Sequence, residues 1–419
     1  MGWRRCWLVG ATLVSVATGM AYSLWWPVLV RHNRTYWLSP GDIWSAVRIA
    51  HFVQWGDLSY VYLFHSTLLS LPGFNVLLAP VAALSSALHL SEMSPTGFPY
   101  KPHAWLLFGP VCLAVTGVGV FACDAVARKI SVRIGVRRLL TVAEVVAIWA
   151  TIAMWGHPED VMALGLALYA LLALSNGRPT LAGWLLGAAI AMQLWVVLLV
   201  PLFLGVTGIR KGAALLARTA VIPGCLLVAV LIPDFHDAYW TLTKQPGFPT
   251  VLHPTPWVLL APHISRIEVS SGPVHLVTLG VAVGLGFLAR RWRTDWATIF
   301  WLAAIAAGIR CLFEPVMAPY YVMPAVAIAF AVGATRGSIR WLLTLIAGFA
   351  LTIMTFSHSG MWTYWFEMAG LLAAVFVSSR PLATGTGGNW EPGDTSGALV
   401  SEPKPERGAY LVSPSGSNT

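Results

Sequence analysis

The chain has 419 residues, of which 57% are hydrophobic and only 10% are charged, and its mean hydropathy is +0.71. This composition excludes an ordinary soluble globular protein and indicates a membrane protein with many apolar helices. The net charge of +9 does not indicate nucleic-acid binding, because the basic residues stand in short clusters between apolar segments, as cytoplasmic Lys and Arg do.

The first apolar segment, residues 7–30, is longer than the core of a cleaved signal peptide, so we expect a retained membrane anchor. Spanning helices need about 20 apolar residues. Further candidates follow in chain order at 104–127, 139–155, 161–175, 219–233, 274–289, 296–310, 320–334, 341–357 and 363–378. The predicted fold is an all-α polytopic membrane protein with about 11–12 transmembrane helices.

Four clusters of basic residues predict which connections face the cytoplasm. They are Arg128, Lys129, Arg133, Arg137 and Arg138; Arg210, Lys211 and Arg218; Arg290, Arg291 and Arg293; and Arg336 and Arg340. With these four connections inside, both termini are predicted to be cytoplasmic, and the connections between the clusters face outward.

This sidedness constrains two segments. Residues 72–90 lie inside the first outer loop, 31–103, and contain Pro72 and Pro80, so we expect a re-entrant or interfacial helix there. Residues 181–208 must enter and leave on the cytoplasmic side, which predicts two half-length helices broken near Gln193 and Trp195.

The chain is predicted to divide into a membrane domain, residues 1–378, and a tail. Residues 379–419 are rich in Gly, Ser, Pro and Thr and are predicted to be a disordered cytoplasmic tail. The five cysteines form no C-x-x-C pair and no cluster with histidine, so the sequence predicts neither a disulfide framework nor a cysteine metal site.

The polar residues gather on the predicted outer side. Because ionisable groups at membrane depth are costly and usually line a cavity, we expect one site that faces outward. The candidates are Asp42, Arg48, His51 and Asp57 in the first outer loop, His157, Glu159 and Asp160 in the second, Gln193 at the break, His236, Asp237, Lys244 and His253 after residue 233, and Arg310, Glu314, Tyr320 and Tyr321.

Several of these residues also have a purely structural explanation. Asp42 follows Ser-Pro-Gly and suits a helix N-cap, and Asp57 suits a turn. The two acids after Pro158 are favoured in the first turn of a helix by its dipole. Arg310 stands at a predicted helix end, where an arginine side chain can extend toward the interface between membrane and water.

The order of these features resembles a known superfamily. It comprises an outer loop with an early Asp, a proline-rich re-entrant segment, a polar second outer loop, the segment AGWLLGAAIAMQLWVVLLVPLFL and, later, the pattern R-x-x-x-E-P-x-x-x-P-Y-Y. The pattern over residues 1–378 resembles the GT-C superfamily of integral-membrane glycosyltransferases. It is most similar to the actinobacterial family 87 of polyprenyl-phosphate-mannose-dependent mannosyltransferases.

The resemblance implies roles for particular residues. Asp42 matches the general base of the family, and Glu159 and Asp160, with His157 beside them, match its acidic second outer loop. Gln193 stands where the family usually has Lys, so the phosphate-binding cation would instead be Arg310 or Lys244. Accessory positions in the pattern are Arg48, Asp57, Glu314, Tyr320 and Tyr321.

The implied activity is inverting transfer of a sugar, mannose foremost, from a polyprenyl-phosphate donor to an envelope glycan or glycolipid at the outer face of the plasma membrane. No cofactor is firmly implied, although the outer acids are able to bind a divalent cation. Two alternatives stay open at this point: a transporter or flippase for a lipid-linked substrate, and a catalytically inactive GT-C-like envelope scaffold.

Overall fold

The computed structural model describes residues 6–31, 42–63, 68–90, 104–271, 274–357 and 359–381, and these residues are predominantly helical. The helices are α1 (Cys6–Arg31), α2 (Ile43–Trp55), α3 (Gly73–Ala87), α4 (Trp105–Lys129), α5 (Ile134–Ala153), α6 (Pro158–Ser175), α7 (Pro179–Met192), α8 (Val200–Thr207), α9 (Ile209–Leu231), α10 (Phe235–Lys244), α11 (Val274–Arg291), α12 (Trp296–Phe313), α13 (Met323–Gly333), α14 (Ser338–Met354) and α15 (Met361–Ser379).

Shorter elements lie in the connections. The 3-10 helices are η2 (Leu58–Tyr60), η4 (Leu194–Leu199), η5 (Pro256–Leu260) and η6 (Pro319–Val322). Four two-residue strands form two antiparallel pairs, β1 (Pro246–Gly247) with β3 (Val269–Ser270) and β2 (His253–Pro254) with β4 (Val316–Met317). The predicted tail, 379–419, lies almost entirely outside the described residues.

The prediction of an all-α polytopic membrane protein is confirmed as a class. Among the described residues, seven helices are long and apolar enough to cross a bilayer, namely α1, α4, α6, α9, α11, α12 and α15. Shorter apolar helices, such as α7, α13 and α14, account for most of the remaining predicted segments. The total of 11–12 crossings and the cytoplasmic position of the termini remain predictions.

A buried helix lies at the centre of the bundle. Every residue of α13, sequence MPAVAIAFAVG, is buried, and this helix packs on α5, α12 and α14. A helix that is apolar on all sides has no polar face to offer to water, so its place in the interior follows from its sequence.

The predicted break in residues 181–208 is present. Helix α7 ends at Met192, Gln193 takes an extended conformation (φ −150°, ψ 130°), and the chain resumes as η4 and then α8. Breaking a helix frees backbone and side-chain polar groups, which a membrane domain tolerates only where protein or a cavity satisfies them. The break therefore marks a place where polar groups are needed.

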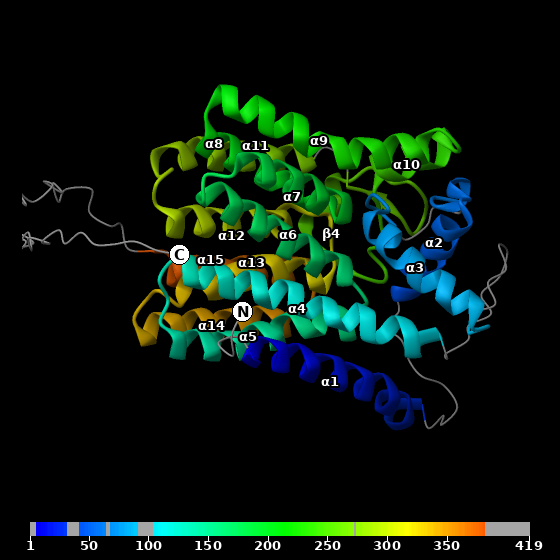
Figure 1. The fold of residues 1–419 in the computed structure, drawn as a ribbon, viewed down its shortest axis with the longest axis horizontal. Helices are drawn as coiled ribbons and strands as arrows, with labels where there is room; N and C mark the ends of the chain where they lie inside the picture. The colour runs from blue at the N-terminus through cyan, green and yellow to red at the C-terminus, as the bar shows by residue number, and fades with distance from the viewer. Residues whose placement is uncertain are drawn as a thin grey trace, which may run out of the picture. The chain divides into compact units, whose positions relative to one another are not determined.

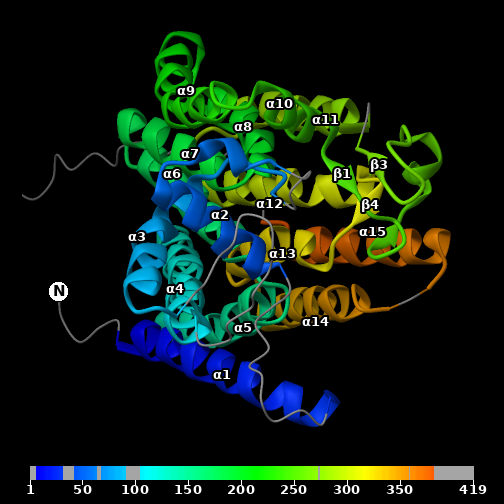
Figure 2. The same ribbon diagram turned by 90° about the vertical axis from the view of Figure 1, so that its right-hand side faces the viewer.

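Helices α2 and α3 pack against each other beside one end of the long helices (Figures 1 and 2). The start of α3 packs closely against the end of α7, and a Cβ atom at Gly73 would collide there with the backbone carbonyl of Ala191. Asn75 Nδ2 donates to the carbonyl of Ala46 at 2.9 Å and ties the two short helices together. Within the segment 72–90, α3 is a single helix of fifteen residues that contains Pro80. This helix is shorter than one that spans a bilayer.

Candidate functional site

An imidazole held between two carboxylates forms the centre of the site. His157 precedes α6, directly after Gly156, whose positive φ of 79° suits a residue without Cβ. Its Nε2 lies 2.9 Å from Asp42 Oδ2, and its Nδ1 lies 2.7 Å from Glu159 Oε1. Segments 115 residues apart are thereby joined. We call Asp42, His157, Glu159 and Asp160 the His157 cluster.

The fourth member, Asp160, is almost completely buried and takes its partners from the broken helix. Trp195 Nε1 donates to Asp160 Oδ1 at 2.9 Å, and Gln193 Nε2 donates to Oδ2 at 3.3 Å. His157 Nδ1 lies 3.8 Å from the same carboxylate. A buried carboxylate is costly unless it is hydrogen-bonded, so the break at Gln193 supplies the donors that Asp160 needs.

The carboxylates keep His157 protonated. Burial alone would lower its pKa, but Glu159, Asp42 and Asp160 together outweigh burial and raise the pKa of His157 from 6.5 to about 10. Tyr320 stacks on the ring, with the two ring centroids 3.6 Å apart. The cluster therefore contains a fixed cation at neutral pH, held by carboxylates at its edges and by an aromatic ring on its face.

A second cation, Arg310, lies near Asp160. Arg310, in the last turn of α12, donates from Nε to Glu314 Oε1 at 3.2 Å, and its guanidinium carbon lies 3.5 Å from the ring centroid of Tyr321. It interacts electrostatically with Asp160 as well. Tyr320 and Tyr321 pack edge to face in η6, with centroids 5.0 Å apart, so neighbouring residues cover the two cations.

The end of α12 that carries Arg310 is fixed by hydrogen bonds to its carbonyl oxygens. The Leu312 carbonyl accepts from the indole nitrogens of Trp257 and Trp365 at 2.7 and 2.8 Å. The Glu314 carbonyl accepts from Thr255 Oγ1 at 2.6 Å. These bonds satisfy acceptors that a helix end otherwise leaves open.

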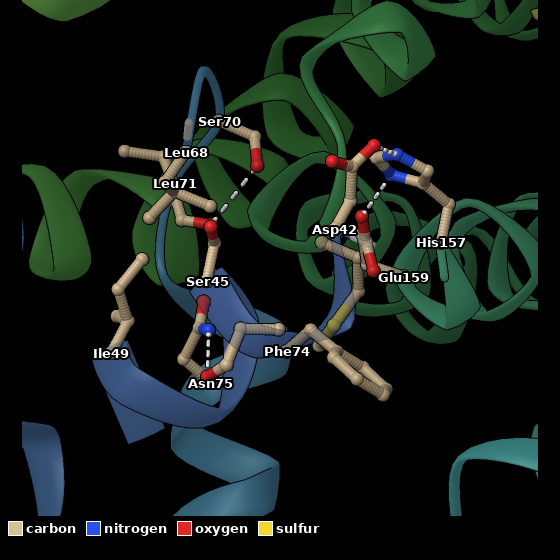
Figure 3. Close-up of a pocket in the computed structure, with 12 residues that line it drawn as sticks. Asp42, Ser45, Ile49, Leu68, Ser70, Leu71, Phe74, Asn75, His157 and Glu159 are labelled. Atoms are coloured by element: carbon tan, nitrogen blue, oxygen red, sulfur yellow. Dashed lines mark hydrogen bonds and ion pairs between the residues drawn. The ribbon is translucent and has the colours of Figure 1, made fainter. Parts of the chain in front are cut away.

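A small pocket opens beside the cluster (Figure 3). Asp42, His157 and Glu159 lie on one side of it, and residues of α2, α3 and the segment before α3 lie on the other. The opposite wall combines polar and apolar side chains, among them Ser45, Ile49, Leu68, Ser70, Leu71, Phe74 and Asn75. The Asp42 side chain is 51% exposed, so a carboxylate faces the pocket while His157 holds one of its oxygens.

The structure brings most of the predicted site residues together. Asp42, His157, Glu159, Asp160, Gln193, Arg310, Glu314, Tyr320 and Tyr321 form one continuous set of contacts. Asp42 occupies the N-cap position of α2, but its side chain makes no capping hydrogen bond and instead pairs with His157. Glu159 and Asp160 do lie in the first turn of α6, so the helix dipole favours them in addition to His157.

Three of the residues with a predicted phosphate-binding or accessory role lie elsewhere. Lys244 ends α10 with an exposed side chain, and within the part of the chain that the structure describes this side chain makes no contact with the His157 cluster. Asp57 accepts a hydrogen bond from Ser59 at 2.7 Å in the turn after α2, as its structural explanation predicts. Arg48 is half-buried on α2.

Trp195 and His275 contact the site residues directly, and sequence reasoning did not include them. Trp195 bonds Asp160, and His275 Nε2 lies 2.7 Å from Glu314 Oε2. Trp195 stands at the predicted break, which was the available signal. Nothing in the sequence pairs His275 with a residue 39 positions later.

His157, Glu159 and Asp160 also bring together three side chains of the types that bind metal ions. One nitrogen and two carboxylate oxygens lie within 4.8 Å of one another. Glu159 Oε2 is buried and has no hydrogen-bond partner among the described residues. These ligand atoms fit a divalent cation that binds nitrogen and oxygen ligands. Such an ion would have to displace the proton on His157 Nδ1.

Comparison of the chain with known protein families, characterised proteins and solved structures finds no match. The geometry of the site is therefore the basis for any functional conclusion.

We predict that His157 contributes stability that alkaline pH removes. Its pKa is raised on folding from 6.5 to about 10, so the stabilisation is complete below pH 6.5 and disappears as the pH rises through about 10. Thermal unfolding of the purified protein should show a decline toward alkaline pH that is much shallower in His157→Gln. The exposed His236→Gln variant is the control, and equal declines in all three proteins would contradict the assignment.

We also predict weak, strongly pH-dependent metal binding at the His157 cluster. Because the proton on His157 has a pKa of about 10, its competition lowers the apparent metal affinity at pH 7 by roughly a thousandfold. The affinity for Mn²⁺, measured by calorimetry or by electron paramagnetic resonance, should rise roughly tenfold per pH unit. Glu159→Gln should abolish the binding. Tight binding that is independent of pH would show that a metal, and not the proton, belongs in the cluster.

Proposed function

We propose that the protein is an integral-membrane glycosyltransferase that moves a sugar, mannose foremost, from a polyprenyl-phosphate donor to an envelope glycan or glycolipid. The observation that carries the proposal is the combination of an accessible carboxylate, Asp42, with a partly accessible arginine in one group of contacts. Sugar transfer from a lipid phosphate requires a base for the acceptor and a cation for the leaving group.

Asp42 is the proposed general base. Its Oδ2 accepts from His157, while Oδ1 bonds no other residue in the described part of the chain and is open to an acceptor hydroxyl. In the proposed step the hydroxyl proton moves to Asp42, the hydroxyl oxygen bonds the anomeric carbon, and the bond from that carbon to the phosphate oxygen breaks. The polyprenyl phosphate leaves as an anion and needs no acid, and the anomeric configuration inverts.

Arg310 is the proposed partner of the phosphate. Its Nε is occupied by Glu314 and its face by Tyr321, whereas its terminal nitrogens donate to no residue in the described ranges. The side chain is 19% exposed, so an anion can reach it. A guanidinium offers two parallel donors to phosphate, and its effect is large where water is scarce. Gln193, which stands where the family usually has Lys, serves Asp160 instead.

The local charge limits where the phosphate can bind. The group contains the carboxylates Asp42, Glu159, Asp160 and Glu314, whereas its cations are His157 and Arg310. The acids Asp42 and Glu159 line the pocket, whereas Arg310 does not line it. An anionic donor would therefore approach Arg310 from its own side and would leave the pocket beside Asp42 to the acceptor.

A second, narrow pocket is the proposed contact site for the donor's lipid. It lies between α5, η6 and α14 and is lined mostly by apolar residues. Tyr320 lines it and also stacks on His157, so one side chain separates this pocket from the cluster. The indole of Trp155 packs on Phe356 in its wall, a surface suited to an isoprenoid chain.

The proposed orientation has about 11–12 crossings, both termini in the cytoplasm and the site at the outer face of the plasma membrane. It is supported by the direction of the helices. Helix α6 begins at the cluster and ends at Ser175, whose carbonyl accepts from Lys129 Nζ at 3.2 Å. The basic connection that follows α4 thus lies at the end of α6 opposite the site, as the positive-inside rule requires for an outward-facing site.

Cysteine labelling tests this orientation. In a protein whose exposed Cys6 and Cys225 are replaced by Ser, Arg133→Cys should react with a membrane-impermeant maleimide only after the cells are permeabilised. Val251→Cys, at a residue that is 79% exposed in the connection between β1 and β2, should react in intact cells. The opposite labelling pattern would place the site on the cytoplasmic face.

Replacing the proposed base tests the activity. Asp42→Asn keeps the size of the side chain but removes the proton acceptor, so sugar transfer by purified protein should fall by at least about a hundredfold. Asp237→Asn in α10 removes the same charge away from the cluster and should retain activity. Transfer is measured in detergent with a radiolabelled polyprenyl-phosphate sugar, without any membrane gradient.

The same assay separates the alternatives. Undiminished transfer by Asp42→Asn would remove Asp42 from the mechanism. Movement of a lipid-linked substrate across vesicles, without sugar transfer in detergent, would identify a transporter or flippase. The absence of both activities from the wild-type protein would indicate a binding scaffold.

A further inference from the structure

Glu314 holds two side chains at once. Its Oε1 accepts from Arg310 Nε at 3.2 Å, and its Oε2 lies 2.7 Å from His275 Nε2. The Glu314 side chain is only 6% exposed, whereas that of His275, in the first turn of α11, is 39% exposed. A partly exposed histidine on one helix is thus linked through a buried carboxylate to the arginine on the next.

We propose that His275 is a positioning residue, which orients Arg310 through Glu314 so that the terminal nitrogens of Arg310 face an incoming phosphate. The proposal rests on the function proposed above and adds a residue for which the resemblance implied no role.

The backbone near Arg310 is already fixed, so its side-chain contacts decide where the guanidinium points. The carbonyls of Leu312 and Glu314 are tied to Trp257, Trp365 and Thr255. The Arg310 side chain has several rotatable bonds, and among its short contacts are the Tyr321 ring on its face and Glu314 on its Nε edge. Of these two contacts, the one with Glu314 fixes rotation within the plane of the guanidinium.

His275 in turn fixes the carboxylate that makes this edge contact. Without a donor at Oε2, a buried Glu314 would have one oxygen unsatisfied and would be free to turn toward Arg310 with both oxygens. A carboxylate that accepts from both nitrogens of one guanidinium edge would occupy a terminal nitrogen that the phosphate needs. The bond to His275 keeps Glu314 bound to Nε alone.

Electrostatics supports the same assignment. Burial would raise the pKa of Glu314, but the hydrogen bond from His275 and the charge of Arg310 outweigh burial and hold that pKa below its ordinary value. Glu314 is therefore an anion with two partners, and loss of either partner changes the strength with which it holds the other.

The test compares binding of a polyprenyl phosphate with binding of the polyprenol of the same chain length, by native mass spectrometry of the purified protein. A change in overall fold or in the lipid groove affects both ligands, whereas a misdirected Arg310 affects only the phosphate. The wild-type protein should prefer the phosphate. His275→Leu should reduce this preference roughly tenfold, the effect of about one hydrogen bond to a charged group.

Three further variants make the test specific. His275→Gln retains a donor for Glu314 and should preserve most of the preference. His236→Leu, an exposed histidine on α10, should leave it unchanged. Glu314→Gln should also reduce the preference for the phosphate. The double variant with His275→Leu should lose no more of this preference than the single variant that loses more, because both substitutions act through one contact.

The outcomes separate this inference from the proposed function. A wild-type protein that does not prefer the phosphate contradicts the donor site itself. A wild-type preference that His275→Leu retains in full, or an equal loss of both ligands in His275→Leu, overturns the positioning role. If His275→Leu does not fold, His275→Asn takes its place, because its shorter amide cannot reach Glu314 without moving the backbone.

Discussion

A charge buried in a membrane domain persists only where an opposite charge, hydrogen bonds or an aromatic face compensates for the lost water. His157 shows the rule most clearly, because carboxylates occupy both of its nitrogens and Tyr320 covers its face. Arg310 repeats the arrangement with Glu314 at its edge and Tyr321 on its face. The site is in effect two compensated cations, and Asp160 interacts with both of them.

The irregular parts of the fold are the parts that supply this compensation. The interruption between α7 and α8 brings Gln193 and Trp195 to Asp160. The extended and 3-10 residues after α12 bring η6 over both cations, and the small β2–β4 pair fixes the chain between them. A bundle of uninterrupted helices would satisfy its own backbone but would leave these charges without partners.

Much of this arrangement could be predicted from the sequence, for one reason in the case of the helices and for another in the case of the site. Hydropathy and segment length predicted the helices, because a bilayer imposes both. The break near Gln193 was predicted from the side on which the flanking basic residues were expected to lie. The grouping of Asp42, Glu159 and Arg310 followed from the same sidedness, since residues confined to one end of a bundle have little space in which to separate.

Pairings between distant side chains could not be predicted in this way. The contact between His275 on α11 and Glu314 at the end of α12 depends on how the two helices are aligned, and the hydrophobic pattern of the sequence does not determine that alignment. Asp42 illustrates the related difficulty that one residue type suits two roles, since an aspartate at the start of a helix serves equally as a cap. Only the orientation of its side chain toward His157 separates the two.

The adjacent tyrosines of η6 have a mechanical consequence. Because Tyr320 rests on one cation and Tyr321 on the other, a shift of this single turn would displace the covers of both together. The surroundings of His157 and those of Arg310 therefore both depend on the position of this one dipeptide. An occupant that lifts the turn from the pocket beside Trp155 would loosen both halves in a single movement.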